Sequence, residues 1–376
     1  MTTSSLSVSP SDPANSSRPP RHDTKVGDGK KASPEGCDFE VDQGVEVVDP
    51  KAQTGVFVAR SNLSLTTEGD SGNIIPTGTK LKTKDAEYSV VELVGRGGLG
   101  DVYKVQGENG FFAVKIINEA GLNSGLTLAR FQRELEILEK LKHRNIIPIL
   151  GQGNFEQRPF FVMPFIEGES LEKLIKRGKL PSSEKANIIV VKIAIEVCDA
   201  LIYAHEKGII HRDIKPGNIM ISDDNTVYVC DFNIASDRNS TTLNQTGQQI
   251  PGTPKYMSPE QAGGKGKDET TSLTDLFSLG VTMYELLTGK VPFDGSSTNV
   301  VMARITSRAF EDVAIPPIKI NPKVDPELNS IVVGLLQKDP EIGRIDFPNA
   351  TSPKDRLEEL LDELRKREIK QRKTAA

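Results

Sequence analysis

The sequence has no tryptophan, few aromatic residues, only three cysteines and no long apolar run. The cysteines lie too far apart for a disulfide framework or a zinc site, which favours a reducing, cytoplasmic setting. The N-terminal stretch MTTSSLSVSP lacks the cationic and apolar segments of a signal peptide. The most apolar stretch, Ile188 to Val197, is interrupted by Lys192 and Glu196 and is far shorter than the roughly 18 apolar residues that a membrane span needs. These absences predict a soluble chain without a membrane partner.

The chain also has no excess of positive charge, since 47 Lys and Arg residues stand against 52 Asp and Glu, a net charge of −5. A nucleic-acid-binding protein usually carries a basic excess, so no nucleic-acid partner is expected. Hydrophobic residues make up 36% of the sequence. This share is low for a chain that folds throughout, so part of it is predicted to be disordered, while the rest is long enough to bury a large core.

Composition divides the chain into four sections. Residues 1–36 are dominated by Ser, Thr, Pro and Gly and are predicted to be a disordered tail, because so few large apolar side chains cannot offset the entropy lost on ordering. Residues 37–86 alternate short apolar patches with Gly, Thr and Asp, which favours a linker over a short packed extension. Residues 88–365 form the predicted domain. Residues 366–376 form a basic tail, interpreted as a solvated helix end rather than a binding patch.

The predicted domain begins β-rich and continues helical. Strands are expected at Tyr88–Val94, Asp101–Val105, Phe111–Ile117, Ile146–Leu150 and Phe160–Phe165, with one helix at about 126–142. Helices are then expected at Leu171–Lys176, Lys185–Lys207, Ser272–Thr288, 296–308, 326–337 and from Ser352, a candidate cap, to about Gln371. Short β patches at 209–234 and a long polar loop at 235–270 lie between them. The fold class is therefore α+β, with a small β-rich lobe at 88–164 and a larger helical lobe at 168–365.

A glycine-rich stretch, GRGGLG at 95–100, lies between two predicted strands. Glycines let backbone N–H groups approach phosphate oxygens because no Cβ atom stands in the way. A dinucleotide-binding loop would lead into a helix, whereas DVYK at 101–104 continues as a strand. The pattern favours a hairpin that covers phosphates, with a flexible turn as the alternative.

A lysine lies inside an apolar strand, in FAVK at 112–115. A buried charge is costly unless it is paired. Glu134, which lies off the apolar face of the predicted helix that follows, can be the partner of Lys115. The alternative is that Lys115 extends along an exposed face and keeps its ammonium group in water.

The sequence HRDIKPGN at 211–218 brings a carboxylate, a cation and an amide together after an apolar helix. Asp213 can orient and deprotonate a hydroxyl group, and Lys215 can neutralise a phosphoryl group in transfer. Asn218 can ligate magnesium through its amide oxygen, and Asp231, after a strand at 226–230, can hold a metal that bridges nucleotide phosphates. In this order and spacing, the motifs predict phosphoryl transfer.

These motifs resemble those of eukaryotic-like serine/threonine protein kinases over about residues 88–365, roughly three quarters of the chain. The resemblance implies a two-lobed protein-kinase fold with ATP in the cleft. It implies Mg²⁺ as the metal, with Mn²⁺ as an alternative. It also implies transfer of the ATP γ-phosphoryl group to Ser and Thr hydroxyls of protein substrates, the chain itself included. Lys215 is typical of the Ser/Thr-directed members.

For ATP, the resemblance implies that Lys115 holds the α- and β-phosphates while it pairs with Glu134. It places the hinge at 161–166, where Met163 is the gatekeeper and the carbonyl of Pro164 and the N–H of Ile166 bond adenine. The other ATP-binding residues that it implies are Val94, Gly95, Gly97, Gly100, Val102, Ala113 and Met220.

For catalysis, the resemblance implies that Asp213 accepts the proton of the substrate hydroxyl and that Lys215 stabilises the γ-phosphate. Asn218 and Asp231 would bind two magnesium ions. The stretch GTPKYMSPE at 252–260 resembles the substrate-docking end of an activation segment, in which Thr253 would bond Asp213 and Lys215.

Three further residues are implied as structural supports. Asp275 would brace the catalytic-loop backbone around 211–212, and Glu260 would form a buried pair with Arg344. Arg212 directly precedes the catalytic carboxylate, an arrangement often paired with a phosphate in the activation segment.

The residues between 234 and 251 are rich in Ser and Thr. We predict autophosphorylation there, with Thr246 and Thr242 as the leading sites. A solvated loop that is merely rich in hydroxyl groups is the alternative.

One residue departs from the family pattern: Asn233 stands where the family usually has glycine. That position changes backbone direction between active and inactive states, and Asn tolerates positive φ better than most residues, so we expect a cost of about 1 kcal/mol or less.

An active kinase is the leading prediction. A pseudokinase scaffold that binds nucleotide without efficient turnover is the alternative that Asn233 motivates. The docking segment at 252–260 argues against a small-molecule phosphotransferase.

Overall fold

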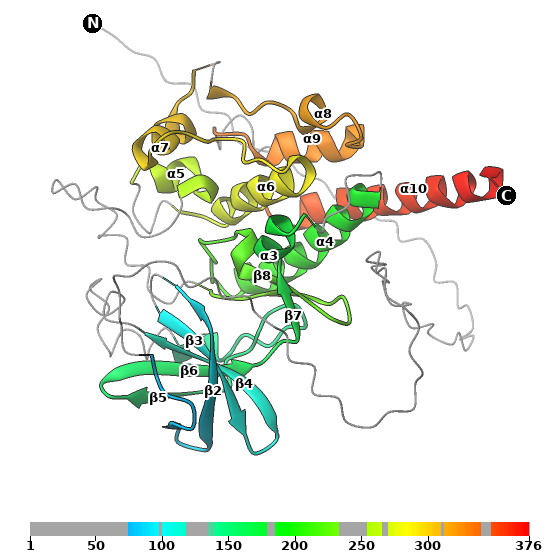
Figure 1. The fold of residues 1–376 in the computed structure, drawn as a ribbon. Helices are drawn as coiled ribbons and strands as arrows, with labels where there is room; N and C mark the ends of the chain where they lie inside the picture. Colours follow the sequence, from blue (N-terminus) through cyan, green and yellow to red (C-terminus); the bar gives the residue numbers. More distant parts are fainter. Residues whose placement is uncertain are drawn as a thin grey trace, which may run out of the picture. The chain divides into compact units, whose positions relative to one another are not determined.

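The computed structural model describes residues 74–97, 100–117, 135–136, 138–178, 185–232, 254–264, 270–309, 312–339 and 347–375. All of them belong to one unit of the chain, Phe39–Ala376. Figure 1 shows a β-sheet in blue to teal, followed along the chain by helices in green to red. The predicted α+β order, strands first and helices second, is confirmed. The predicted tail at 1–36 lies outside the described residues.

Six antiparallel strands form the first section, in the order β1-β2-β3-β4-β6-β5. They are β1 (Lys80–Lys82), β2 (Glu87–Arg96), β3 (Gly100–Gly107), β4 (Gly110–Ile117), β5 (Gly151–Phe155) and β6 (Arg158–Pro164). Alternate apolar residues bury one face of this sheet, and Val105, Val114 and Phe160 are fully buried there. Strand β4 pairs with β3 on one side and β6 on the other, so Lys115 lies on an interior strand.

Two predictions for this section are wrong in part. Strand β1 lies within the stretch predicted as a linker, and the N–H of Ile75 already bonds the Tyr103 hydroxyl (3.2 Å), so ordered packing begins before residue 88. The strand predicted at 146–150 forms instead at Gly151–Phe155. Within 146–150, residue 146 makes only an isolated bridge, and Pro148 has no N–H to donate to a ladder. Most of the helix predicted at 126–142 lies outside the described residues. Of its described part, residues 135, 136 and 138 are helical, whereas 139–142 are not.

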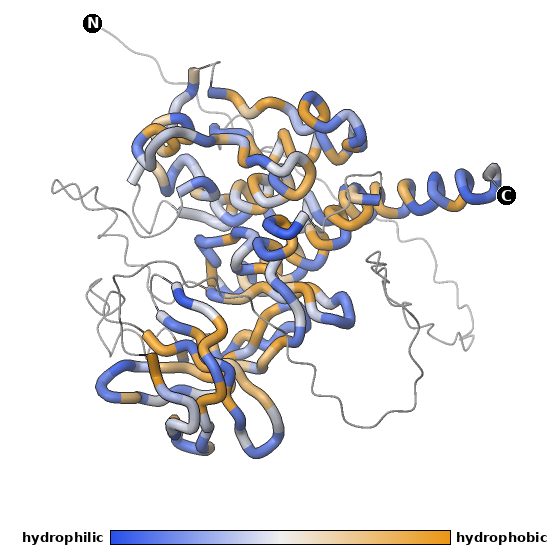
Figure 2. The backbone as a smooth tube through the Cα atoms, in the orientation of Figure 1, coloured by the Kyte–Doolittle hydropathy of each residue, from blue (hydrophilic) through white to orange (hydrophobic). Residues whose placement is uncertain are grey.

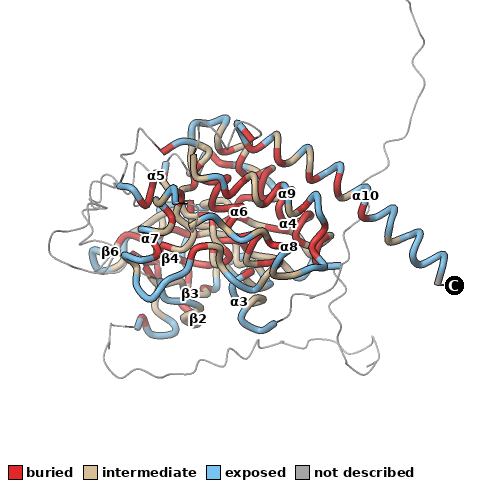
Figure 3. Tube along the Cα trace, turned by 90° about the horizontal axis from the view of Figure 1, so that it is seen from above, coloured by how far each residue is buried: buried red, intermediate tan, exposed pale blue. Residues whose placement is uncertain are grey.

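The second section is mostly helical. Its helices are α3 (Leu171–Lys176), α4 (Lys185–Glu206), α5 (Pro259–Ala262), α6 (Leu273–Thr288), α7 (Thr298–Thr306), α8 (Pro317–Ile320), α9 (Pro326–Leu335) and α10 (Thr351–Ala375). Helices α4 and α6 supply much of the core, including Val197, Leu201 and Phe277. Both are rich in hydrophobic residues in Figure 2 and largely buried in Figure 3. Gly208 follows α4 and Gly289 ends α6, with φ of +72° and +69°, which glycine adopts without Cβ strain.

Two details of the helical section differ from the sequence prediction. The stretch predicted as a long loop at 235–270 contains a 3₁₀ turn at Pro254–Tyr256 and helix α5. Helix α10 is capped by Asn349 rather than Ser352, because the Asn349 side chain accepts the N–H groups of Thr351 (3.0 Å) and Ser352 (3.3 Å). The last turns of α10 are hydrophilic in Figure 2 and exposed in Figure 3.

A small second sheet confirms the β patches predicted at 209–234. It contains β7 (Gly168–Ser170), β8 (Ile219–Ser222) and β9 (Val227–Val229), in that order. Strand β8 begins directly after Asn218, and β9 ends two residues before Asp231. The sheet therefore brings these two polar residues together. No helix within the described ranges is long and apolar enough to cross a membrane.

Candidate active site

The loop at 211–218 is held from beneath by Asp275 of α6, which is fully buried. One oxygen of its carboxylate accepts the N–H of Arg212 (2.7 Å), and the other accepts the N–H of His211 (2.9 Å). His205 of α4 places its Nε2 2.8 Å from the second oxygen. Arg212 has φ +65°, a left-handed conformation that is costly for a side chain of this kind, and these bonds hold it there. This is the bracing that the resemblance implies for Asp275.

Two polar side chains of the loop, Lys215 and Asn218, converge on Asp213. The Lys215 ammonium lies 2.7 Å from Asp213 Oδ2, and the Asn218 amide donates to the same oxygen (2.9 Å). The Asn218 amide also donates to the carbonyl of Asp213 (2.8 Å). A carboxylate, a cation and an amide therefore occupy one small volume, as their spacing in the sequence predicts.

Asp231 faces this loop from the end of β9 and contacts Lys115 of β4. The Lys115 ammonium lies 2.7 Å from Asp231 Oδ2. Burial alone would raise the pKa of the Asp231 carboxyl, but the charge and hydrogen bond of Lys115, with smaller contributions from His211 and Lys215, lower it. Asp231 is therefore ionised at neutral pH, as a metal ligand must be. It also has a positive φ, +59°.

Asn218 and Asp231 fit a magnesium site that a nucleotide completes. The Asn218 amide nitrogen is engaged with Asp213, which leaves its Oδ1 as the ligand atom. Magnesium is typically bound by one or two carboxylates together with substrate phosphates rather than by a cage made wholly of protein. The described part of the chain holds no cluster of three or more His, Cys, Asp and Glu side chains suited to a metal.

Most of the residues implied for nucleotide binding lie on adjoining strands of the six-stranded sheet. Val102 on β3 is the register partner of Lys115 on β4, and Ala113 is the partner of Met163 on β6. Pro164 ends β6, and Ile166 follows it. Val94 and Gly95 lie on β2, whereas Met220 lies on β8 of the three-stranded sheet. The predicted lysine, gatekeeper and hinge thus come from neighbouring strands.

Gly100 illustrates why the glycine-rich stretch needs glycine. A Cβ atom at this position would lie 2.4 Å from the carbonyl oxygen of Ile116, which no real Cβ tolerates. The N–H of Gly97 donates to the carbonyl of Gly100 (3.0 Å), which links the end of β2 to the start of β3. The close approach of β3 to β4 therefore requires a residue without a side chain here.

Several predicted residues lie outside the described part of the chain, and the structure says nothing of their contacts. They are Glu134, Asn233, Thr242, Thr246, Thr253 and Arg344. Glu260, the implied partner of Arg344, accepts a hydrogen bond from the Thr274 hydroxyl (2.7 Å).

A cavity of about 580 Å³ lies beside the 211–218 loop, and no pattern in the sequence indicates it. Lys215 and Gly217 of this loop contribute to its lining, as do Tyr256 and Glu285. The Tyr256 hydroxyl donates to the Glu285 carboxylate (2.5 Å). Burial, followed by this bond, raises the pKa of Tyr256, and burial also raises the pKa of Glu285. Tyr256 and Glu285 lie 29 positions apart, so no local pattern indicates their contact.

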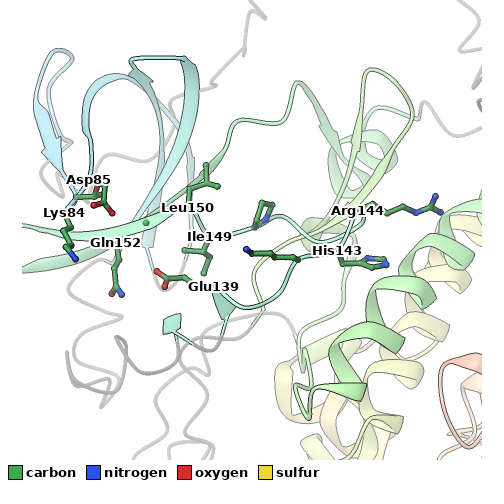
Figure 4. A pocket seen from close by; sticks show the side chains of 12 residues that line it. Lys84, Asp85, Glu139, His143, Arg144, Ile149, Leu150 and Gln152 are labelled. Carbon is green, nitrogen blue, oxygen red and sulfur yellow. The ribbon is translucent and has the colours of Figure 1, made fainter.

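A second cavity, of about 830 Å³, contains none of the predicted nucleotide-binding or catalytic residues. Figure 4 shows Glu139 and Ile149 within its lining, with Lys84 on one side and His143 and Arg144 on the other. His143 and Arg144 contact helix α4: the His143 ring stacks on Tyr203, and Arg144 lies 3.5 Å from Asp199.

Comparison with known proteins identifies the family. The profile of the protein kinase domain matches residues 88–376, and the chain belongs to this family. A probable serine/threonine-protein kinase of Clostridium perfringens is 37% identical over 256 residues, which cover 67% of this chain and 36% of the relative. The serine/threonine-protein kinase PknB of Mycobacterium leprae is 33% identical over 262 residues, which cover 68% and 40%.

Solved structures agree with the fold. The PknI kinase domain of Mycobacterium tuberculosis superposes with a TM-score of 0.57 at 23% identity, covering 76% of this chain and 98% of that domain. A structure of residues 1–466 of Rad53 in complex with AMP-PNP also gives a TM-score of 0.57, at 28% identity, covering 72% of this chain and 64% of that Rad53 chain. The chain spans between 36% and 48% of the length of the curated relatives compared with it.

Proposed function

We propose that the chain is an ATP-dependent protein serine/threonine kinase. The observation that carries this proposal is the convergence of Lys215 and Asn218 on Asp213, with Asp231 presented from β9 and held by Lys115. In the proposed reaction, a substrate hydroxyl oxygen forms a bond to the γ-phosphorus as the bond to the leaving ADP oxygen breaks. Asp213 receives the hydroxyl proton, and Lys215 offsets charge on the transferring group.

Asn218 and Asp231 would hold Mg²⁺, or Mn²⁺ as an alternative, which neutralises charge on the β- and γ-phosphates when bound. Lys115 would move from Asp231 toward the α- and β-phosphates, with Glu134 as its further partner. Val94, Val102, Ala113 and Met220 would enclose the adenine, and the hinge backbone at 164 and 166 would bond its edge. The cavity beside Lys215 offers space for a substrate side chain next to the accepting hydroxyl.

We further propose that the protein phosphorylates itself at Thr242 and Thr246, so that Arg212 gains a phosphate partner.

We also propose a cytoplasmic location, where ATP is available and thiols stay reduced. Cys198 and Cys230 are free, and burial raises the pKa of Cys198 to about 12, as expected for an inert thiol in a core.

The direct test is phosphoamino-acid analysis after incubation with γ-labelled ATP, Mg²⁺ and a generic acceptor protein. We expect label on serine and threonine of the acceptor and of the kinase, with the label on the kinase reduced in a Thr242→Ala/Thr246→Ala variant. Label on tyrosine alone would contradict the proposed specificity. Bound nucleotide with no label anywhere would favour a nucleotide-binding scaffold, and Asn233→Gly would then be the variant to assay.

A further inference from the structure

One face of helix α4 holds the segment 142–147, which we call the connector because it leads into the six-stranded sheet. Glu196, Asp199 and Tyr203 are spaced three and four residues apart, so they share this face. The Tyr203 hydroxyl accepts the N–H of Lys142 (3.0 Å), and Asp199 lies 3.5 Å from Arg144. In Figure 4 the Arg144 side chain points away from Lys84 and Gln152, toward the helices drawn in green.

Glu196 contacts both the connector and strand β9. Its Oε2 accepts a hydrogen bond from the amide of Asn145 (2.7 Å), a fully buried side chain, and another from the N–H of Val227 (3.1 Å). The same Asn145 amide donates to the carbonyl of Val227 (2.9 Å). Helix, connector and β9 are therefore tied together by one ring of hydrogen bonds.

The connector also pairs directly with β9. The N–H of Val229 donates to the carbonyl of Asn145 (2.8 Å), and the N–H of Ile147 donates to the carbonyl of Val229 (3.1 Å). The other edge of β9 pairs with β8, which follows Asn218. Asp231 comes two residues after β9, so its place relative to Asn218 depends on how firmly β9 is held on both edges.

We propose that Glu196 is a positioning residue for Asp231. Glu196 acts through Val227 and β9: its carboxylate oxygen fixes the strand whose end presents Asp231 to the metal-bound nucleotide. The inference rests on the proposed function only in taking Asp231 as a metal ligand. Positioning partners of metal ligands typically contribute 10- to 100-fold in metal affinity.

Both hydrogen bonds end on the same oxygen of Glu196, so substitutions can separate the role of the hydrogen-bond acceptor from the role of the negative charge. A glutamine can place its Oε1 there and accept both, so Glu196→Gln keeps the ring. Glu196→Met has a side chain of similar length and no comparable acceptor, so it removes both bonds. Glu206→Gln is the matched control, an exposed glutamate of the same helix.

The test measures the affinity of a fluorescent ATP analogue with and without Mg²⁺ for wild type and the three variants. Glu196→Met should lose on the order of tenfold of the Mg²⁺-dependent gain while the Mg²⁺-free affinity stays unchanged. Glu196→Gln and Glu206→Gln should match wild type. A merely structural role would instead lower both affinities together, and this result would overturn the proposal.

If Glu196→Met does not fold, Asn145→Ser removes the long amide donor and tests the same ring, with the same loss expected. An unchanged Mg²⁺-dependent gain in the folded variant would overturn the proposal, as would an equal loss in Glu196→Gln. The readout is binding, so a wild type that binds Mg²⁺-nucleotide without phosphotransfer would contradict the kinase function while leaving this test valid. A wild type without any Mg²⁺-dependent gain would overturn the role of Asp231 and this inference together.

Discussion

The ammonium group of Lys115 lies 2.7 Å from the carboxylate of Asp231, and this contact joins the inner strand β4 to a residue two positions after the end of β9. The Lys115 side chain is 15% exposed, so water screens the pair only partly. The contact keeps Asp231 ionised and brings the proposed phosphate-binding cation and the proposed metal ligand within reach of one nucleotide.

Lys115→Met removes the charge that lowers the pKa of Asp231. A carboxyl with a lowered pKa in the folded protein stays charged until the pH falls through that lowered value, so in the variant its charge is lost at higher pH. We expect kcat/KM for ATP to fall about 100-fold and its acid limb to move to higher pH. Steady-state kinetics across pH 5 to 8 would measure this. Lys80→Met, at an exposed edge position, is the control, and equal pH profiles for the two variants would contradict the account.

Gly100→Ala should destabilise the sheet, because the added Cβ would lie 2.4 Å from the carbonyl oxygen of Ile116. Overpacking of this kind costs about 1–3 kcal/mol, and the displaced hairpin should raise KM for ATP. Urea unfolding and ATP kinetics measure the two effects. Gly151→Ala is the matched control, because its Cβ would meet Thr83 at an ordinary 3.5 Å. Equal stabilities of the two variants would argue against close β3–β4 packing.

Asp275→Asn should weaken both the fold and turnover. The carboxylate accepts two backbone N–H groups of the catalytic loop, one on each oxygen, whereas an amide has a single acceptor oxygen. A buried donor left without an acceptor costs about 1–3 kcal/mol. Since Asp213 directly follows Arg212, kcat should fall more than KM for ATP rises. Asp223→Asn, an exposed carboxylate, should leave both unchanged, and a wild-type kcat in Asp275→Asn would contradict the bracing role.

Much of this site could be predicted from the sequence because its parts are local. Asp213, Lys215 and Asn218 lie within one loop, and their spacing alone brings them together. The strand that carries Lys115 could be predicted from its β-branched and aromatic residues. In these cases residues that are close along the chain are also close in space.

The parts that could not be predicted depend on contacts between distant residues. Glu196 shows in the sequence only as a charge inside an apolar helix, and its partners, Asn145 and Val227, lie 51 and 31 positions away. The prediction of a strand at 146–150 is wrong for a similar reason, because contacts with distant residues decide the structure of this segment. Its apolar residues suit a strand, but tertiary packing uses this segment as a connector against α4 and β9, and the edge strand forms at 151–155.

Glu196→Gln should change the pH dependence of stability. Burial raises the pKa of the Glu196 carboxyl above its usual value near 4.5. A raised acid pKa means that the folded state binds more protons, so this group makes stability fall as the pH rises from its unfolded to its folded pKa. Glutamine keeps the hydrogen bonds and removes this titration. The variant should therefore be at least as stable as wild type at neutral pH, with its advantage shrinking as the solution is acidified.

Urea unfolding at several pH values would measure this difference, with Glu206→Gln as the control. A Glu196→Gln variant that is less stable than wild type at neutral pH would show that the carboxylate charge is needed.

The most direct test of the account is to measure phosphotransfer and ATP binding side by side in wild type and Asp213→Asn. We expect wild type to transfer label from γ-labelled ATP in the presence of Mg²⁺. Asp213→Asn should lose about 10²- to 10⁴-fold of that activity, because the asparagine amide cannot accept the hydroxyl proton, while ATP binding is retained. Unchanged phosphotransfer in Asp213→Asn, with both proteins folded and binding ATP, would contradict the assignment of Asp213 and with it the proposed mechanism.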